Sequence, residues 1–226
     1  MQVLTGRRDS RLNTVKQKCM QINSSIKVHV AQLDIRDSKR VDEVITALPL
    51  DFKAIDVLVN NAGLAIGVDE VADVTNEAID RVIDTNVKGL LYVTRAVLKG
   101  MKERGHGHII NIGSIAGNAY PNGSVYCASK YAVHAISQSL RAETISVPIK
   151  VTEINPGKVE TEFSKVRFGG DEVRAAKVYE GIEAMTGDDV AEAVVFAASR
   201  HKRCVISDIV MLATGQVSAT VVHRKL

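Results

Sequence analysis

The chain has 226 residues, 46% of them hydrophobic, so it can bury one sizeable core, and we expect a single domain over residues 1–226. Its 29 basic and 26 acidic residues give a formal net charge of +3 without long runs of either sign. That mixture favours a small-molecule partner and argues against nucleic acid. The sequence shows neither a signal-peptide pattern nor an apolar stretch long enough to span a bilayer, which predicts no membrane association and a cytoplasmic location.

Three scattered cysteines, Cys19, Cys127 and Cys204, form no C-x-x-C pair. Their number and spacing argue against a disulfide framework and against a structural zinc site. We therefore expect a reducing compartment and no bound metal.

Short β-branched runs alternate with longer amphipathic stretches up to about residue 212. This alternation predicts an α/β fold with a parallel sheet. Strands are expected at Val3–Thr5, Ile26–Leu33, Ile55–Val59, His108–Ile112, Ile149–Ile154 and Ile209–Leu212. Helices are expected from Ser38 to near Pro49, over Asn76–Arg104 and Ser124–Ser146, and from Gly187. The polar segment Thr161–Thr186 is interrupted by glycines and is predicted to form a mobile helical lid.

A tyrosine and a lysine four residues apart, Tyr126 and Lys130, share one face of an expected helix, and Ser114 follows the strand before it. A lysine ammonium beside a phenol favours the phenolate and is expected to lower the pKa of Tyr126 towards working pH, as a general base requires. Ser114 could then hold the substrate oxygen. In isolation, such a pair is more often a solvated feature of a helix surface, so the interpretation depends on the surrounding motifs.

Four further motifs occur in order along the chain: Asn60-Asn61-Ala62-Gly63, Asp84-Thr85-Asn86-Val87, Gly113-Ser114 and Pro156-Gly157. With the Tyr126 segment, they make the sequence resemble the short-chain dehydrogenase/reductase family from about residue 1 to 215. The resemblance implies a Rossmann-like, doubly wound parallel sheet with helices on both faces. It also implies catalytic roles for Ser114, Tyr126 and Lys130, and a supporting role for Asn86 in a proton relay through water to Lys130. The alternative for Asn86 is a polar helical residue whose side chain is satisfied by a neighbour.

Two arginines, Arg7 and Arg8, follow the first expected strand, where family members that use NAD usually carry an acid for the ribose 2′-hydroxyl. Guanidinium groups suit a 2′-phosphate instead, so the resemblance predicts NADP as the cofactor. The alternative is a solubilising pair in a loop.

Further cofactor contacts are implied by the resemblance alone. Asp34 corresponds to the acid that contacts the adenine, and Asn60 to its partner at the adenosine ribose. Tyr126 and Lys130 also reach the nicotinamide ribose in this family. Val159 and Thr161 follow Pro156-Gly157, where the carboxamide is held.

The substrate class is suggested by the segment 156–168, by Tyr179 and by Tyr120-Pro121, which resemble NADP-dependent 3-hydroxy acid dehydrogenases acting on serine or allo-threonine. A carboxylate substrate needs a cation, and Arg167 is the candidate. A solvated lid arginine is the alternative. Lys158 stands where relatives commonly carry an apolar residue, which could change how the cofactor or substrate fits.

The family begins with a strand, a glycine-rich turn and a helix that receives the pyrophosphate. The sequence lacks this segment, because Thr5-Gly6-Arg7-Arg8 has the wrong spacing and no second glycine. The absent strand would be the central one, so we expect exposed apolar edges at the strands of Val3 and Ile55, poor folding or weak NADP binding.

Three functions remain open from the sequence. The first is hydride transfer between NADP and the 3-hydroxyl carbon of a small 3-hydroxy acid. The second is reduction of another carbonyl or aldehyde by the same residues, and the third is a truncated, non-catalytic protein of this fold. By analogy with the family, the long helices 76–104 and 124–146 predict a homodimer or homotetramer.

Overall fold

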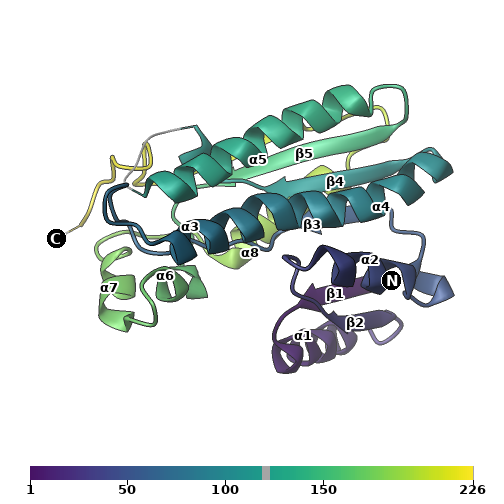
Figure 1. The fold of residues 1–226 in the computed structure, drawn as a ribbon, viewed down its shortest axis with the longest axis horizontal. Coiled ribbons are helices and arrows are strands. Elements are labelled where there is room, and N and C mark those ends of the chain that lie inside the picture. The colour runs from purple at the N-terminus through teal and green to yellow at the C-terminus, as the bar shows by residue number, and fades with distance from the viewer. Residues whose placement is uncertain (119–122, 226) are drawn as a thin grey trace.

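The computed structural model describes residues 1–118 and 123–225, so Tyr120 and Pro121 lie outside the described residues. Within these ranges, six strands form two parallel sheets (Figure 1). Their bounds are β1 (Gln2–Gly6), β2 (Val28–Gln32), β3 (Val57–Asn60), β4 (Gly107–Ile112), β5 (Ile149–Pro156) and β6 (Asp208–Met211). β1 pairs with β2, and the second sheet has the order β3-β4-β5-β6. The expected strand positions and the parallel α/β class are confirmed.

The helices are α1 (Asp9–Ile22), α2 (Ser38–Thr46), α3 (Asn76–Ile83), α4 (Leu90–Arg104), α5 (Ser124–Glu143), α6 (Glu162–Arg167), α7 (Glu172–Lys177) and α8 (Gly187–Ala198). Short 3-10 turns lie at Leu50–Phe52 and Ile115–Gly117. One correction concerns Asn76–Arg104, which we expected to be one continuous helix. A π-helical turn over Asp84–Gly89 divides it into α3 and α4. Such turns bulge the helix locally and are frequent at functional sites.

The core lies between the second sheet and two helices that cross it, α4 and α5 (Figure 1). Val97 and Met101 of α4 and Leu140 of α5 pack against Ile109 of β4 and Val151 of β5. On the opposite face, α8 packs against β5. Strands covered on both faces are rich in apolar residues, which explains why the isoleucines and valines of β4 and β5 could be recognised as strands.

The two sheets do not join, because β1 and β3 each have one edge without a partner strand among residues 1–118 and 123–225. Val57 and Val59 of β3 are consequently 42% and 40% exposed. The apolar exposure expected at this edge is therefore observed. The pair β1–β2 is covered by α1, which contributes no buried residue. A two-stranded sheet with so little burial is marginal by itself.

Amide hydrogen exchange should differ between the two sheets, because local stability follows the amount of buried apolar contact. We expect peptides from residues 1–32 to exchange much faster than peptides from residues 107–112 and 149–156 under the same conditions. Mass spectrometry after timed labelling measures this directly. Equal protection of the two sheets would show that β1–β2 opens only with the whole fold.

Candidate active site

The carboxyl ends of β3, β4 and β5 meet at one edge of the second sheet, where open α/β folds bind their ligands. Asn60 and Pro156 end β3 and β5, and Ser114 follows β4. Ser114 begins the 3-10 turn that follows, and its Oγ accepts a hydrogen bond from the Ala116 amide at 3.1 Å. This turn directs Ser114 towards the N-terminal part of α5.

Tyr126 lies on α5 with its phenol against Ser114. Burial raises the pKa of Tyr126, whereas hydrogen bonding to Ser114 and the positive charge of Arg167 oppose that rise. In this structure the phenol therefore holds its proton at neutral pH.

Lys130 is buried one turn further along α5, and its Nζ donates a hydrogen bond to the Ile112 carbonyl at 2.8 Å. Burial lowers the pKa of Lys130 to about 8, against a smaller opposing effect of the Glu153 charge. Its Nζ lies 5.8 Å from the centre of the Tyr126 ring. The expected lowering of the pKa of Tyr126 by Lys130 is not seen. Burial raises this pKa, and the groups that oppose the rise are Ser114 and Arg167.

Asn86 lies in the π-helical turn and is 2% exposed. Its Oδ1 accepts from the Leu64 amide at 2.8 Å, and its Nδ2 donates to the Leu64 carbonyl at 2.8 Å and to Ser129 Oγ at 3.0 Å. The side chain thus fixes the loop after β3 against α5. A Cβ on Gly63 would lie 3.3 Å from Asn86 Oδ1 and 3.8 Å from Lys130 Nζ, so this loop passes directly over both polar groups.

Arg167 ends α6 and brings its guanidinium over the Tyr126 ring, 5.1 Å from the ring centre, and 5.5 Å from that of Phe163. Its Nε is buried without a hydrogen-bond partner. The structure therefore places a cation with an unused donor beside the tyrosine.

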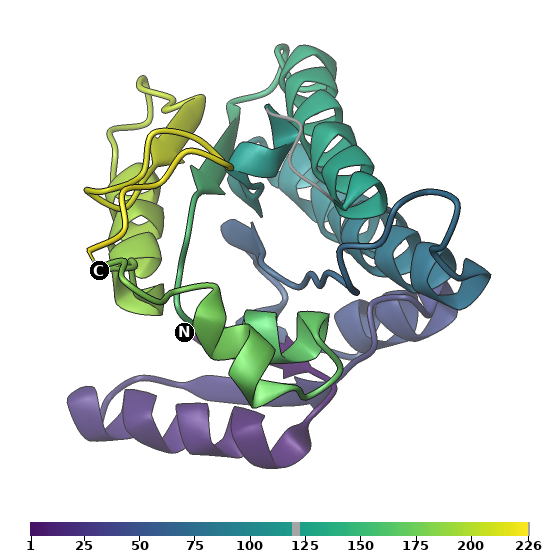
Figure 2. The ribbon, with the colours of Figure 1, turned by 90° about the vertical axis from the view of Figure 1, so that its left-hand side faces the viewer.

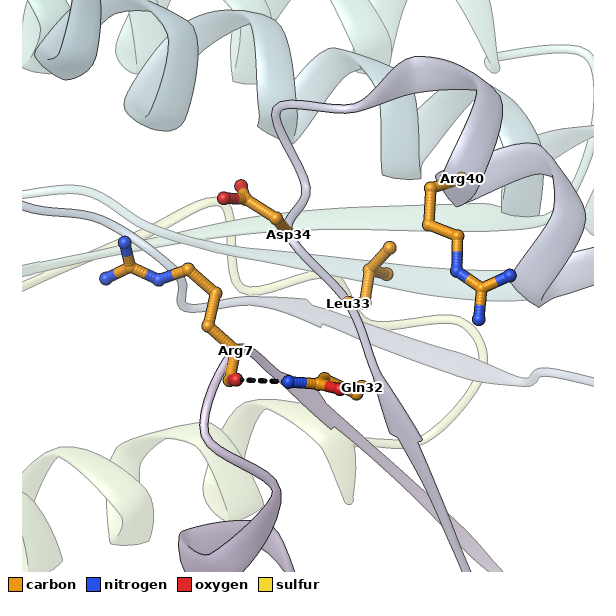
Figure 3. Close-up of a pocket in the computed structure, with 5 residues that line it drawn as sticks. All are labelled: Arg7, Gln32, Leu33, Asp34 and Arg40. Atoms are coloured by element: carbon orange, nitrogen blue, oxygen red, sulfur yellow. Dashed lines mark hydrogen bonds between the residues drawn. The ribbon is translucent and has the colours of Figure 1, made fainter.

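Two further expected residues, Arg7 and Asp34, line a pocket beside the end of β2 (Figure 3). Arg7 and Arg40 contribute guanidinium groups from either side of Leu33 and Asp34, and Gln32 donates a hydrogen bond to the Arg7 carbonyl at 2.9 Å. An adjoining pocket continues past Arg7 and Asp34 to residues 62–64 and 85, and so reaches the loop that passes over Asn86 and Lys130.

Arg8 points elsewhere. Its Nη2 lies 2.9 Å from one oxygen of Glu162, while Arg11 lies 2.7 Å from the other. Glu162 begins α6, so these exposed ion pairs connect the start of α6 with the start of α1. In Figure 2 the green helices α6 and α7 are drawn above the purple helix α1. Such an exposed contact adds little stability.

Other expected cofactor residues have partners within the protein. Asp34 accepts three hydrogen bonds from the Arg36 side chain and one from its amide, which lower the pKa of the carboxyl. Asn60 donates to Thr94 Oγ1 and Asn111 Oδ1, both at 2.9 Å, and so ties β3 to α4 and β4.

The segment after β5 is held by its own contacts. The Val159 carbonyl accepts a hydrogen bond from the Tyr179 hydroxyl at 2.9 Å. Thr161 Oγ1 accepts one from the Phe163 amide and caps α6. Both residues thus shape the lid, which consists of α6 and α7 and carries Arg167.

Sequence reasoning missed Arg40 and Asn155. Arg40 lies in the first turn of α2, shortly after Asp34, and that spacing was the available signal. Asn155 Oδ1 accepts a hydrogen bond from the Ser114 amide at 2.9 Å. Its position directly before Pro156 could have suggested a place at the same edge.

Comparison with known proteins agrees with this geometry. The model of the short chain dehydrogenase family matches residues 1–170. The NADP-dependent 3-hydroxy acid dehydrogenase of Schizosaccharomyces pombe is 43% identical over 218 residues, 95% of this chain and 84% of the relative. The Escherichia coli K12 protein YdfG, of the same name, is 43% identical over 226 residues, 99% of this chain and 89% of the relative.

Among solved structures, the closed form of serine dehydrogenase complexed with NADP+ has a TM-score of 0.90 and 42% identity. The match covers 99% of this chain and 89% of that one. Among the described residues, no helix is both long and apolar enough to cross a membrane.

Gly113 provides a test of how tightly the serine strand end is packed. A Cβ at this position would lie 2.6 Å from Glu153 Oε1 and closer still to Asn155 Oδ1. We expect Gly113→Ala to lower the free energy of unfolding by about 1–3 kcal/mol, as overpacked sites do. Urea unfolding measures the change.

The matched control is Gly187→Ala, because nothing lies within 4 Å of a Cβ there. Gly187 is the first residue of α8, where alanine should be neutral or slightly stabilising. Similar losses in both variants would contradict the packing argument at Gly113.

Proposed function

The chain belongs to the short-chain dehydrogenase family, and on that premise we propose that it transfers a hydride between NADP and the 3-hydroxyl carbon of a small 3-hydroxy acid such as serine or allo-threonine. The observation that carries the proposal is the meeting of Tyr126, Ser114 and the Arg167 cation at one sheet edge. The names of the relatives support the same class of substrate.

In the oxidative direction, Tyr126 would accept the proton of the substrate hydroxyl after its own phenol has ionised, and Ser114 would hold the oxygen from which the proton leaves. The buried Lys130 ammonium, fixed by the Ile112 carbonyl, would bind the nicotinamide ribose together with Tyr126. Asn86 would act at one remove by holding the loop over Lys130. In reduction the proton moves the opposite way.

NADP would supply the hydride acceptor when bound. The fit of the chain to its adenosine end rests on Arg7 and Arg40, whose guanidinium groups line one open pocket and suit a 2′-phosphate. We retain Asp34 for the adenine side, Asn60 for the ribose side, and Val159 and Thr161 for the carboxamide. We keep Arg8 as a second phosphate ligand, which requires it to leave Glu162.

Arg167 would bind the substrate carboxylate. Its Nε is buried and lacks a partner, and its guanidinium already lies over the Tyr126 ring. A carboxylate accepted there would lie beside the phenol that receives the hydroxyl proton. In a 3-hydroxy acid the carboxylate and the hydroxyl lie close together, as Arg167 and Tyr126 do in the site.

We also propose one domain for the whole chain, a homodimer or homotetramer and a cytoplasmic location. The cysteine pattern supports a reducing compartment, since none of the three cysteines is in a disulfide. Size-exclusion chromatography with light scattering tests the assembly.

Removing the Tyr126 hydroxyl should abolish turnover, because this phenol is the acid or base that is hydrogen-bonded to Ser114. We expect Tyr126→Phe to lose at least about a hundredfold in kcat, the usual contribution of a positioned acid or base. NADP reduction with serine or allo-threonine measures the loss, and the melting temperature should stay close to that of the parent. Retained turnover would rule out Tyr126 as the catalytic acid or base.

Replacing the proposed carboxylate ligand should weaken substrate binding. We expect Arg167→Ala to raise KM for serine by about tenfold or more, because a charge-assisted hydrogen bond contributes roughly 1.5–3 kcal/mol. Arg174→Ala is the control, since that arginine lies over Phe168 on the same lid. An unchanged KM for serine in Arg167→Ala would contradict this role.

A further inference from the structure

Buried polar side chains lie behind the serine and lysine of the candidate site. His134 of α5 approaches Glu153 of β5, with Nδ1 2.9 Å from Oε2, and the Glu153 side chain is 0% exposed. The other ring nitrogen of His134 lies 2.6 Å from the side-chain amide of Gln138. A neutral imidazole with its proton on Nδ1 satisfies both contacts and leaves Glu153 ionised.

The second oxygen of Glu153 faces the strand end that carries the serine. Oε1 of Glu153 and Nδ2 of Asn155 are both buried without a hydrogen-bond partner. Both side chains lie against Gly113, where they would clash with a Cβ. One atom is an acceptor and the other a donor, so a small displacement would join them. Asn155 already accepts the hydrogen bond of the Ser114 amide. With these two atoms joined, the polar contacts would extend from His134 to Ser114.

Glu153 also acts on Lys130 through its charge. Its carboxylate raises the pKa of Lys130 and so opposes the lowering that burial causes. Burial raises the pKa of Glu153, and the like charge of Asp208 of β6 adds to that rise. Arg141 of α5 pairs with Asp208, with its Nη2 at 3.3 Å. His134 opposes Asp208 by favouring the carboxylate.

We propose that Glu153 is a positioning residue for the reaction. Oriented by His134, its carboxylate holds Asn155 and the Ser114 backbone in place and sets a negative charge behind the Lys130 ammonium. The inference rests on the proposed function for its kinetic consequences. Its structural and electrostatic part can be tested without turnover.

The variant Glu153→Gln keeps the shape and removes the charge. Turnover requires the Lys130 ammonium, so activity should decline at the alkaline end as Lys130 loses its proton. Without the Glu153 charge, we expect this decline in kcat to move to lower pH by about one unit, a tenfold change in the ratio of protonated to neutral lysine. KM for NADP, measured at a pH below this decline, should stay unchanged, because Lys130 keeps its proton there and Glu153 does not line the nucleotide pocket.

Asp208→Asn is the matched control. An oxygen of the Asp208 carboxylate lies within 4.8 Å of His134 and Glu153 side-chain atoms. Asp208 is partly exposed and paired with Arg141. Its removal should therefore leave the alkaline decline of kcat in place. Should Glu153→Gln fail to fold, His134→Gln replaces it, since the loss of the imidazole makes the carboxylate harder to ionise and should move the decline in the same direction.

Thermal melting without substrate gives a readout independent of turnover. The pKa of Lys130 falls from 10.5 to about 8 on folding, so the unfolded chain binds more protons between these values and stability rises with pH there. In Glu153→Gln this rise should begin at lower pH. A melt and kcat profile that keep the parental pH dependence would overturn the proposal. An inactive parent would refute the proposed function alone, and the melts would still decide the role of Glu153.

Discussion

The buried ammonium of Lys130 is the constraint on which the candidate site depends. A buried charge is costly unless it is hydrogen-bonded or compensated, and Lys130 donates to the Ile112 carbonyl while Glu153 supplies a negative charge nearby. Ile112 is the last residue of β4, so the same hydrogen bond fixes α5 against the strand that leads to Ser114. The positions of Tyr126 and Ser114 relative to each other follow from this contact.

The lid extends this arrangement towards the other sheet. One end of α6 holds Arg167 over Tyr126, and the other end places Glu162 against Arg8 and Arg11. The α6–α7 segment therefore contacts both Tyr126 and the segment that follows β1. Because the second contact is exposed, salt should weaken it more than the first.

The sequence predicted the strands, the parallel class and the tyrosine site because buried apolar runs and the order of motifs depend on local residues. It could not predict the directions of long side chains. The expected Arg8 forms an ion pair with Glu162 for this reason, whereas Arg40, which also pairs with Glu43, lines the pocket. The π-helical turn around Asn86 was also missed, because it depends on the tertiary contact with Leu64. The raised pKa of Tyr126 was also not predicted, because it results from burial of the phenol and burial depends on tertiary packing.

We propose that Tyr126, as acid or base, and Arg167, as carboxylate ligand, act on the same small substrate. The most direct measurement compares initial rates of NADP reduction with serine and with its methyl ester, and repeats both with NAD. We expect kcat/KM for serine to be at least about tenfold above that for the ester, because the ester loses one charge-assisted contact. We also expect faster turnover with NADP than with NAD. Equal rates for acid and ester would contradict the role assigned to Arg167, and turnover of neither would contradict the assigned substrate class.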